Sequence, residues 1–183
     1  MSQRRPMMLV ALLVAAGCAA PTAAQPTAGP SPSIMVAVTT DAAWTQLVMA
    51  LDERILTVLD LAPARSRDAG VIALSTDIAA QHRAEVVRLR ANLGILNFPD
   101  DNPHAAHEMP GMITATAFAE IKQASGSGFD RLLAASLRAH LTQCVSLAQS
   151  ELKAGTHAPT RVLATEVEAS RRNDLARLQA LLP

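Results

Sequence analysis

Several side chains that could bind a metal ion lie on the apolar faces of predicted helices. They are His82, Glu85, His140, Cys144 and Asp174. His82 and Glu85 are three residues apart, and residues at this spacing share one face of a helix. Imidazole, thiolate and carboxylate groups together suit a transition-metal ion. The alternative is a set of buried polar residues that pair with one another, with Arg171 or Arg88 balancing the carboxylates, because buried charges need partners.

A second candidate set lies in a predicted loop over residues 97–112, which is rich in proline. Its members are His104, His107, Met109 and Met112. Thioether and imidazole ligands suit Cu(I), and His140 could complete such a site. The alternative is that the two methionines fold back onto the core as hydrophobic side chains.

The sequence contains none of the motifs that would indicate an enzyme. Di-iron proteins with helical bundles use Glu-x-x-His motifs, and here no glutamate is followed by a histidine three residues later. A glycine-rich phosphate loop, a Gly-x-Ser-x-Gly motif and a paired zinc-ligand motif are also missing from the sequence. We therefore expect no enzymatic activity.

The candidate ligands would be positioned by helices, which the spacing of apolar residues predicts. Steps of three and four residues indicate helices over 41–62 and 68–96 in the first half of the chain. Asp41 is the expected N-cap of the first helix, and Pro63 is expected to end it. The second helix is expected to start near Asp68.

The second half repeats this pattern after the loop. A short helix is predicted over 114–124, closed by Gly126 and Gly128, and long helices over 128–154 and 159–182. Gly155 is the expected C-cap of the third long helix. Val162 is expected to face inward on the fourth.

Four long amphipathic helices without a strand signal predict an all-α fold, a four-helix bundle over residues 41–183. Shifting the first half by 89 residues places Leu51 on His140 and Glu85 on Asp174. This favours a helical hairpin used twice, joined by a crossover that holds the short helix. Because aromatic residues are few, the sequence leaves open whether the interior is tightly packed or holds a small apolar ligand.

The first residues predict export and attachment to a membrane. Arg4 and Arg5 precede an apolar run over residues 7–16, which is too short to span a bilayer but suits a signal peptide. The run ends in Ala15-Ala16-Gly17-Cys18, which is similar to a lipobox. We expect cleavage after residue 17, a lipid on Cys18, and a flexible tether over residues 18–40. The protein would then be anchored to the cell membrane on its extracytoplasmic side.

The net charge and the cysteine content indicate which binding partners and which covalent links to expect. Without residues 1–17 the chain has 14 basic and 16 acidic residues, a net charge of −2, and no basic patch. Nucleic acid is therefore not an expected partner. With Cys18 carrying the lipid, Cys144 has no second cysteine, and no disulfide is expected.

The order of these features resembles the family called domain of unknown function 305. The resemblance covers residues 41–182. It rests on the segment Gly126-Ser127-Gly128-Phe129-Asp130-Arg131-Leu132-Leu133 with His140 seven residues later, on the loop from His107 to Thr114, on Asp41 with Trp44, and on His82-Arg83-Ala84-Glu85-Val86. It implies a ferritin-like fold and an exported or membrane-attached protein. Some family members are associated with copper or silver.

The resemblance also implies where a metal site would lie. The family has a His-His pair in each half, backed by Gln-x-x-Glu on the following helix. Here the two pairs fall on Leu51 and Asp52, and on His140 and Leu141. The Gln-x-x-Glu positions fall on His82 with Glu85, and on Arg171 with Asp174. One histidine of four is kept, so most of the family's ligands are predicted to be missing.

Two functions are consistent with the sequence. The first is a non-enzymatic lipoprotein of the cell envelope with a structural or binding role and no cofactor. The second is an extracytoplasmic copper- or silver-binding protein that uses the Met/His set of the loop and His140.

Overall fold

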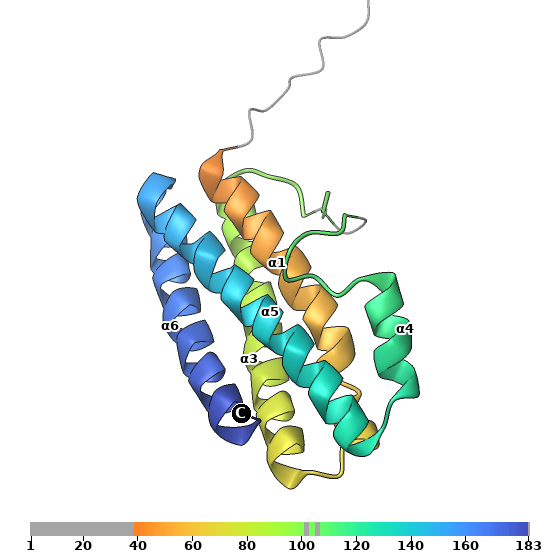
Figure 1. Ribbon diagram of the computed structural model, residues 1–183. Helices are drawn as coiled ribbons and strands as arrows, with labels where there is room; N and C mark the ends of the chain where they lie inside the picture. The colour runs from red at the N-terminus through yellow and green to blue at the C-terminus, as the bar shows by residue number, and fades with distance from the viewer. Residues whose placement is uncertain (1–38, 101–102, 105–106, 183) are drawn as a thin grey trace, which may run out of the picture. The chain divides into compact units, whose positions relative to one another are not determined.

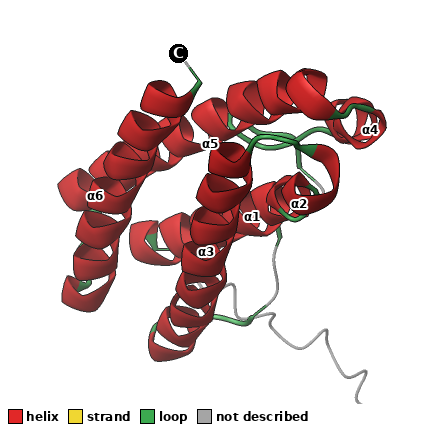
Figure 2. Ribbon diagram, turned by 90° about the horizontal axis from the view of Figure 1, so that it is seen from below, coloured by secondary structure: helices red, strands yellow, loops and turns green. Residues whose placement is uncertain are grey.

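The computed structural model describes residues 39–100, 103–104 and 107–182, which form helices and loops with no β-strand among them. The helices are α1 (Thr40–Leu59), α2 (Ala62–Arg65), α3 (Ala69–Ile95), α4 (Ala115–Gln123), α5 (Gly126–Ala154) and α6 (Ala158–Leu181). α1 pairs with α3 and α5 pairs with α6, while α1 also packs on α5 and α3 on α6 (Figures 1 and 2). The predicted bundle of two hairpins is confirmed, with α4 in the crossover. None of the described helices combines the length and the apolar character needed to cross a bilayer.

The start of α1 differs from the prediction. Thr39, and not Asp41, is the N-cap, because its side chain accepts a hydrogen bond from the backbone N–H of Ala42 at 3.2 Å. Asp41 lies in the first turn of the helix, and its carboxylate accepts hydrogen bonds from another segment of the chain. The second long helix does begin as predicted, with Asp68 as its N-cap.

Proline and glycine also act differently from the prediction at two helix ends. α1 ends at Leu59, and Pro63 lies in the first turn of α2, where its missing N–H costs no hydrogen bond. Pro63 therefore starts a helix and does not end one. Gly126 and Gly128 were expected to close the short helix, but both lie in the first turn of α5. Gly126 has a φ of +54°, which glycine adopts readily.

The core consists of two apolar clusters at the two ends of the bundle. One is built around Ile55, Ile78, Phe129, Leu137 and Leu178. The other is built around Val48, Leu51, Leu89, Ala148 and Val167. Near the boundary between them each long helix carries a polar side chain with 0% exposure, and these are Asp52, His82, His140 and Arg171.

The inner face of α6 is narrower than predicted. Val162 is 57% exposed, whereas the next residue, Leu163, is buried. Successive residues in a helix are rotated by about 100°, so one position separates the core-facing side from the solvent-facing side. The prediction that Val162 faces inward is wrong.

The turn between α5 and α6 is tied to α1 through Asp41. The Asp41 carboxylate accepts hydrogen bonds from the backbone N–H of His157 at 2.8 Å and of Thr156 at 3.1 Å. Beside it, both carboxyl oxygens of Glu151 are buried without a hydrogen-bond donor. Gly155 is the C-cap of α5, as predicted, with a φ of −68°. An added Cβ there would lie 1.9 Å from Glu151 Oε1, so close approach, and not a left-handed backbone, requires glycine.

Glu151 makes the stability of this turn depend on pH. Burial, together with the neighbouring Asp41 carboxylate, raises the pKa of Glu151 to about 7. Because the pKa is higher in the folded than in the unfolded state, the protonated carboxyl stabilises the fold at low pH, and this stabilisation is lost as the pH rises through about 7. We expect Glu151→Gln, which imitates the protonated acid, to become more stable relative to the wild type between about pH 5 and pH 8. Urea unfolding at each pH measures the difference.

Comparing the two proteins isolates the contribution of Glu151. His82 and His140 have lowered pKa values, so their contribution to stability rises with pH, opposite in sign to that of Glu151. The wild type and Glu151→Gln share this histidine contribution, so it cancels in the difference between their unfolding free energies. Arg161, which opposes the shift of Glu151, is also shared. The control Glu108→Gln, in the exposed part of the loop, should show a flat difference. A flat difference for Glu151→Gln would contradict the prediction.

Candidate metal centre

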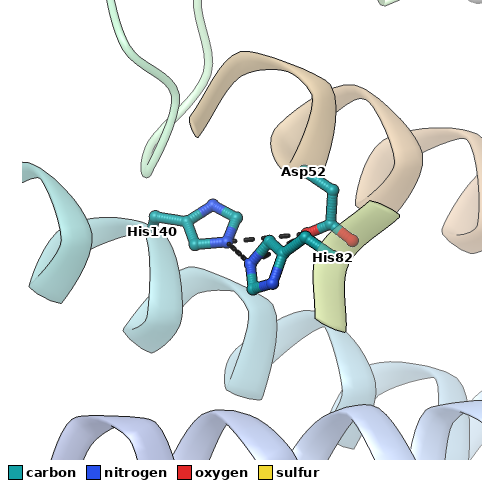
Figure 3. A group of neighbouring side chains, drawn as sticks. All are labelled: Asp52, His82 and His140. Carbon is teal, nitrogen blue, oxygen red and sulfur yellow. Dashed lines mark hydrogen bonds and ion pairs between the residues drawn. The ribbon is translucent and has the colours of Figure 1, made fainter. Parts of the chain in front are cut away.

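Three side chains from three helices converge in the middle of the bundle (Figure 3). Asp52 comes from α1, His82 from α3 and His140 from α5. The two imidazole Nε2 atoms lie 2.9 Å apart, and Asp52 Oδ1 lies 3.5 Å from each of them. All three side chains have 0% exposure. Within the described part of the chain, these three residues form the group of side chains whose ligand atoms lie close enough together to hold a metal ion.

Helix periodicity explains why these side chains meet. Asp52 lies four residues after the core residue Val48 and three before Ile55, so it projects from the buried face of α1. In α3, His82 lies four residues after buried Ile78 and four before buried Val86. His140 has the corresponding position in α5, between buried Leu137 and Cys144. The apolar stripes that close the bundle therefore also bring the polar groups together.

The fourth long helix supplies a buried positive charge. Arg171 of α6 has 0% exposure and donates hydrogen bonds from Nη2 to Asp52 Oδ1 at 2.9 Å and Oδ2 at 3.1 Å. It also donates to Glu85, from Nη2 to Oε1 at 2.6 Å and from Nη1 to Oε2 at 3.2 Å. One guanidinium thus faces two carboxylates. Asp52 is buried away from water, so its negative charge needs a partner inside the protein. Arg171 provides that positive charge.

The electrostatics keep the two histidines neutral. Burial, together with the Arg171 charge, lowers the pKa of His82 and of His140 well below the usual value. Burial also raises the pKa of Asp52, although Arg171 opposes the shift; the Glu85 charge reinforces it. For Arg171, burial alone would lower the pKa, but the two carboxylates outweigh it and keep the guanidinium charged. Neutral imidazoles are the form that binds metal ions.

Cys144 lies one turn after His140 and completes the interior group. Its Sγ is 3.8 Å from His140 Nε2 and 4.0 Å from Nδ1. Burial raises the pKa of the thiol to about 12, so the sulfur is protonated at neutral pH. A protonated thiol is a poor metal ligand. We therefore assign the primary ligand positions to the two imidazoles and the carboxylate.

The spacing of the three donor atoms fits a metal ion. A point equidistant from the two Nε2 atoms and Asp52 Oδ1 lies about 1.9 Å from each in their common plane. Zinc, as one example, binds imidazole nitrogen and carboxylate oxygen at about 2.0–2.2 Å, so these three donors are spaced closely enough that they could hold such an ion. Arg171 hydrogen-bonds the same carboxylate, and such outer contacts commonly orient metal ligands.

The predicted interior residues meet only in part. His82, His140 and Cys144 lie together, and Glu85 joins them through Arg171. Asp174 is buried as predicted, but its ion pair is with Arg177 at 3.1 Å, and it does not belong to the group of three donors. The prediction missed Asp52. Its position between Val48 and Ile55 on the first apolar stripe was the signal that could have identified it.

The predicted loop set is divided between the surface and the core. The rings of His104 and His107 lie 5.7 Å apart, and His107 is exposed. Met109 and Met112 pack against the apolar cluster that contains Cys144, as the alternative interpretation expected. Gly111 has a φ of +80°, and a Cβ there would lie 2.5 Å from Cβ of Gln143, so the loop contacts α5 closely. His140, the proposed fifth member, instead contacts His82 inside the bundle.

Comparison with known proteins identifies relatives of this chain. The model of the family described as "Domain of unknown function (DUF305)" matches residues 41–182. No curated protein matches the chain.

Solved structures share the fold. A DUF305 protein from Streptomyces coelicolor, described as a predicted secreted protein, is 19% identical, with a TM-score of 0.71 over 80% of this chain and 93% of that one. A DUF305 fragment from Deinococcus radiodurans is 18% identical, with a TM-score of 0.70 over 78% of this chain and 95% of that one. A conserved hypothetical protein from Mycobacterium tuberculosis is 17% identical, with a TM-score of 0.59 over 78% and 90%. At these identities the similarity establishes the fold.

Proposed function

The chain belongs to the DUF305 family, and we propose that it is a non-enzymatic binding protein of the cell envelope that holds one transition-metal ion. The ligands would be His82, His140 and Asp52. The observation that carries the proposal is the convergence of two neutral imidazole nitrogens and one carboxylate oxygen at separations of 2.9, 3.5 and 3.5 Å. Such an ion would be a bound cargo, because the chain has no motif for catalysis.

Charge balance supports a monovalent ion. Arg171 faces two carboxylates, so ionised Asp52 leaves the interior with one excess negative charge. A monovalent ion would balance that charge, whereas a divalent ion leaves a buried positive charge, which is costly. Cu(I) and Ag(I) also accept imidazole ligands, and the family resemblance implies the same metals.

Competition for Cu(I) tests the proposal. We would titrate the full chain, in a Cys18→Ser background that removes the terminal thiol, against a chromophoric Cu(I) chelator. We expect one ion per chain, and His140→Leu should weaken the affinity by about 100-fold or more, because losing outer contacts alone weakens metal sites by about 10- to 100-fold. Zn(II) should bind more weakly than Cu(I).

His107→Leu is the matched control. It makes the same substitution at an exposed histidine of the loop, and it should leave the Cu(I) affinity unchanged. If His107→Leu abolishes binding and His140→Leu does not, the ion is held by the loop set. If the unaltered chain binds no Cu(I) beyond a scrambled Met/His peptide, the metal function is excluded.

A second candidate is a structural role, in which Arg171 takes the place of the metal ion. The observation that favours it is that Arg171 donates hydrogen bonds to both interior carboxylates while fully buried. The bundle would then carry its cation within the chain and contribute a protein surface to the envelope. The same titration decides between the two, because a chain of this kind binds no Cu(I).

We also propose that the protein is anchored to the membrane through a lipid on Cys18, which lies outside the described residues together with the predicted signal peptide. Support comes from the lipobox-like sequence that ends at Cys18. We expect Cys18→Ala to move the protein from the detergent phase to the aqueous phase in a Triton X-114 separation. The far-ultraviolet circular dichroism of the helical domain should be unchanged. Equal partitioning of both proteins would exclude the lipid anchor.

A further inference from the structure

A groove between α3 and α6 lies over the interior group. It has a volume of about 250 Å³ and is lined by Gln81, Ala84, Glu85, Arg88, Leu163, Glu166, Val167 and Ser170. Among its lining residues, Glu85 is the one that also belongs to the interior group, through its hydrogen bonds to Arg171. The groove therefore borders the buried site at Glu85.

Glu85 is the member of the interior group that solvent reaches. Its side chain is 12% exposed, whereas Asp52, His82, His140 and Arg171 have 0% exposure. From the groove, polar atoms follow one another inward. Glu85 Oε1 is 2.6 Å from Arg171 Nη2, which is 2.9 Å from Asp52 Oδ1, and that oxygen is 3.5 Å from both histidines.

Two side-chain bridges between α3 and α6 border this position. Arg88 pairs with Glu166 on one side of Glu85, and Ser170 donates a hydrogen bond to Gln81 at 3.0 Å on the other. Arg88 and Glu166 are both about half exposed, at 53% and 50%. Exposed ion pairs of this kind contribute little to stability, so this bridge can open without unfolding the bundle. Ala84, which has a small side chain, also lines the groove.

We propose that this groove is the entrance to the buried site and that Glu85 is the first ligand that an entering cation meets. The Arg88–Glu166 ion pair, which bridges α3 and α6, partly closes this entrance. The inference rests on the proposed metal function for its cargo. The groove thus sets the rates of loading and release, while the three inner ligands set the affinity.

Rates of Cu(I) exchange test the entrance. Ala84→Phe places a large ring in the groove and should slow loading and release of Cu(I) by the same factor, about 10-fold or more, with the equilibrium affinity unchanged. Ala80→Phe makes the same change at an exposed position of α3 outside the groove lining, and it should change neither rate. Glu166→Gln removes the Arg88–Glu166 ion pair and should increase the rates of loading and release by about two- to fivefold. Unchanged rates in Ala84→Phe, with Cu(I) still bound, would overturn the entrance and leave the metal function standing.

A second measurement uses no metal. In the Cys18→Ser background, Cys144 is the remaining thiol and lies against His140. When this thiol reacts with methyl methanethiosulfonate, it loses its proton to solvent, and its sulfur attacks the reagent, whose S–S bond breaks to give a methyl disulfide and methanesulfinate. We expect Ala84→Phe to slow this reaction about 10-fold relative to Ala80→Phe at equal unfolding free energy. A slowed reaction without Cu(I) binding supports the entrance and excludes the metal function, and equal rates overturn the entrance.

Discussion

Arg171→Met is expected to lower the free energy of unfolding by about 3–5 kcal/mol, because it leaves Asp52 and Glu85 without their counter-charge. The Asp52 carboxylate has 0% exposure and cannot be solvated in the folded state. The variant should therefore take up protons to stay folded, and its loss of stability should grow as the pH rises. Urea unfolding at about pH 5 and about pH 8 measures both effects.

Arg172→Met is the matched control. It makes the same change one residue later, at a side chain that is 56% exposed and pairs with Glu168 on the helix surface. It should cost less than about 1 kcal/mol. Adding Asp52→Leu and Glu85→Gln to Arg171→Met should restore most of the lost stability, since replacing all partners of a buried ion pair is often neutral. A small loss in Arg171→Met itself would show that the interior carboxylates are not charged.

Phe129→Ala is the second substitution with a large expected effect, a loss of about 3–5 kcal/mol in unfolding free energy. Phe129 has 0% exposure and belongs to the apolar cluster that also contains Ile121 of α4 and Leu133 of α5. Removing its ring leaves a cavity that the surrounding helices cannot fill. Chemical denaturation followed by circular dichroism measures the change.

Phe118→Ala provides the comparison, because this ring is only partly buried against the same cluster. Its loss should be clearly smaller. Losses of equal size would mean that the first turn of α5 is not the packed end of the bundle. The result also assigns a role to the Gly126–Asp130 segment that resembles the family sequence, since Phe129 anchors α5 in the core.

Periodicity predicted the four long helices because each must bury an apolar stripe, and the structure agrees to within a few residues at each end. The ends themselves depend on local hydrogen bonds. Thr39 replaced Asp41 as the first cap because the Asp41 carboxylate binds backbone N–H groups 115 and 116 residues away, at Thr156 and His157. Such long-range partners leave no signal in the local sequence.

The candidate site was predictable in the residues that periodicity places inward. His82, His140 and Cys144 follow from the stripes, and the alternative of a paired polar interior names Arg171 or Arg88 as the counter-charge. The prediction omits Asp52, although its spacing from Val48 and Ile55 places it on the same buried face of α1. Asp174 is three residues after Arg171, which places it on the next turn beside Arg177.

The contact between the two imidazoles constrains the hydrogen atoms of the site. At 2.9 Å, the two Nε2 atoms can share one hydrogen but cannot both carry one. One ring must therefore be the Nε2–H tautomer and the other the Nδ1–H tautomer. Whichever ring donates, its Nε2 hydrogen lies between the two rings. A ligand that needs both Nε2 lone pairs must first move that hydrogen to the other side of its ring.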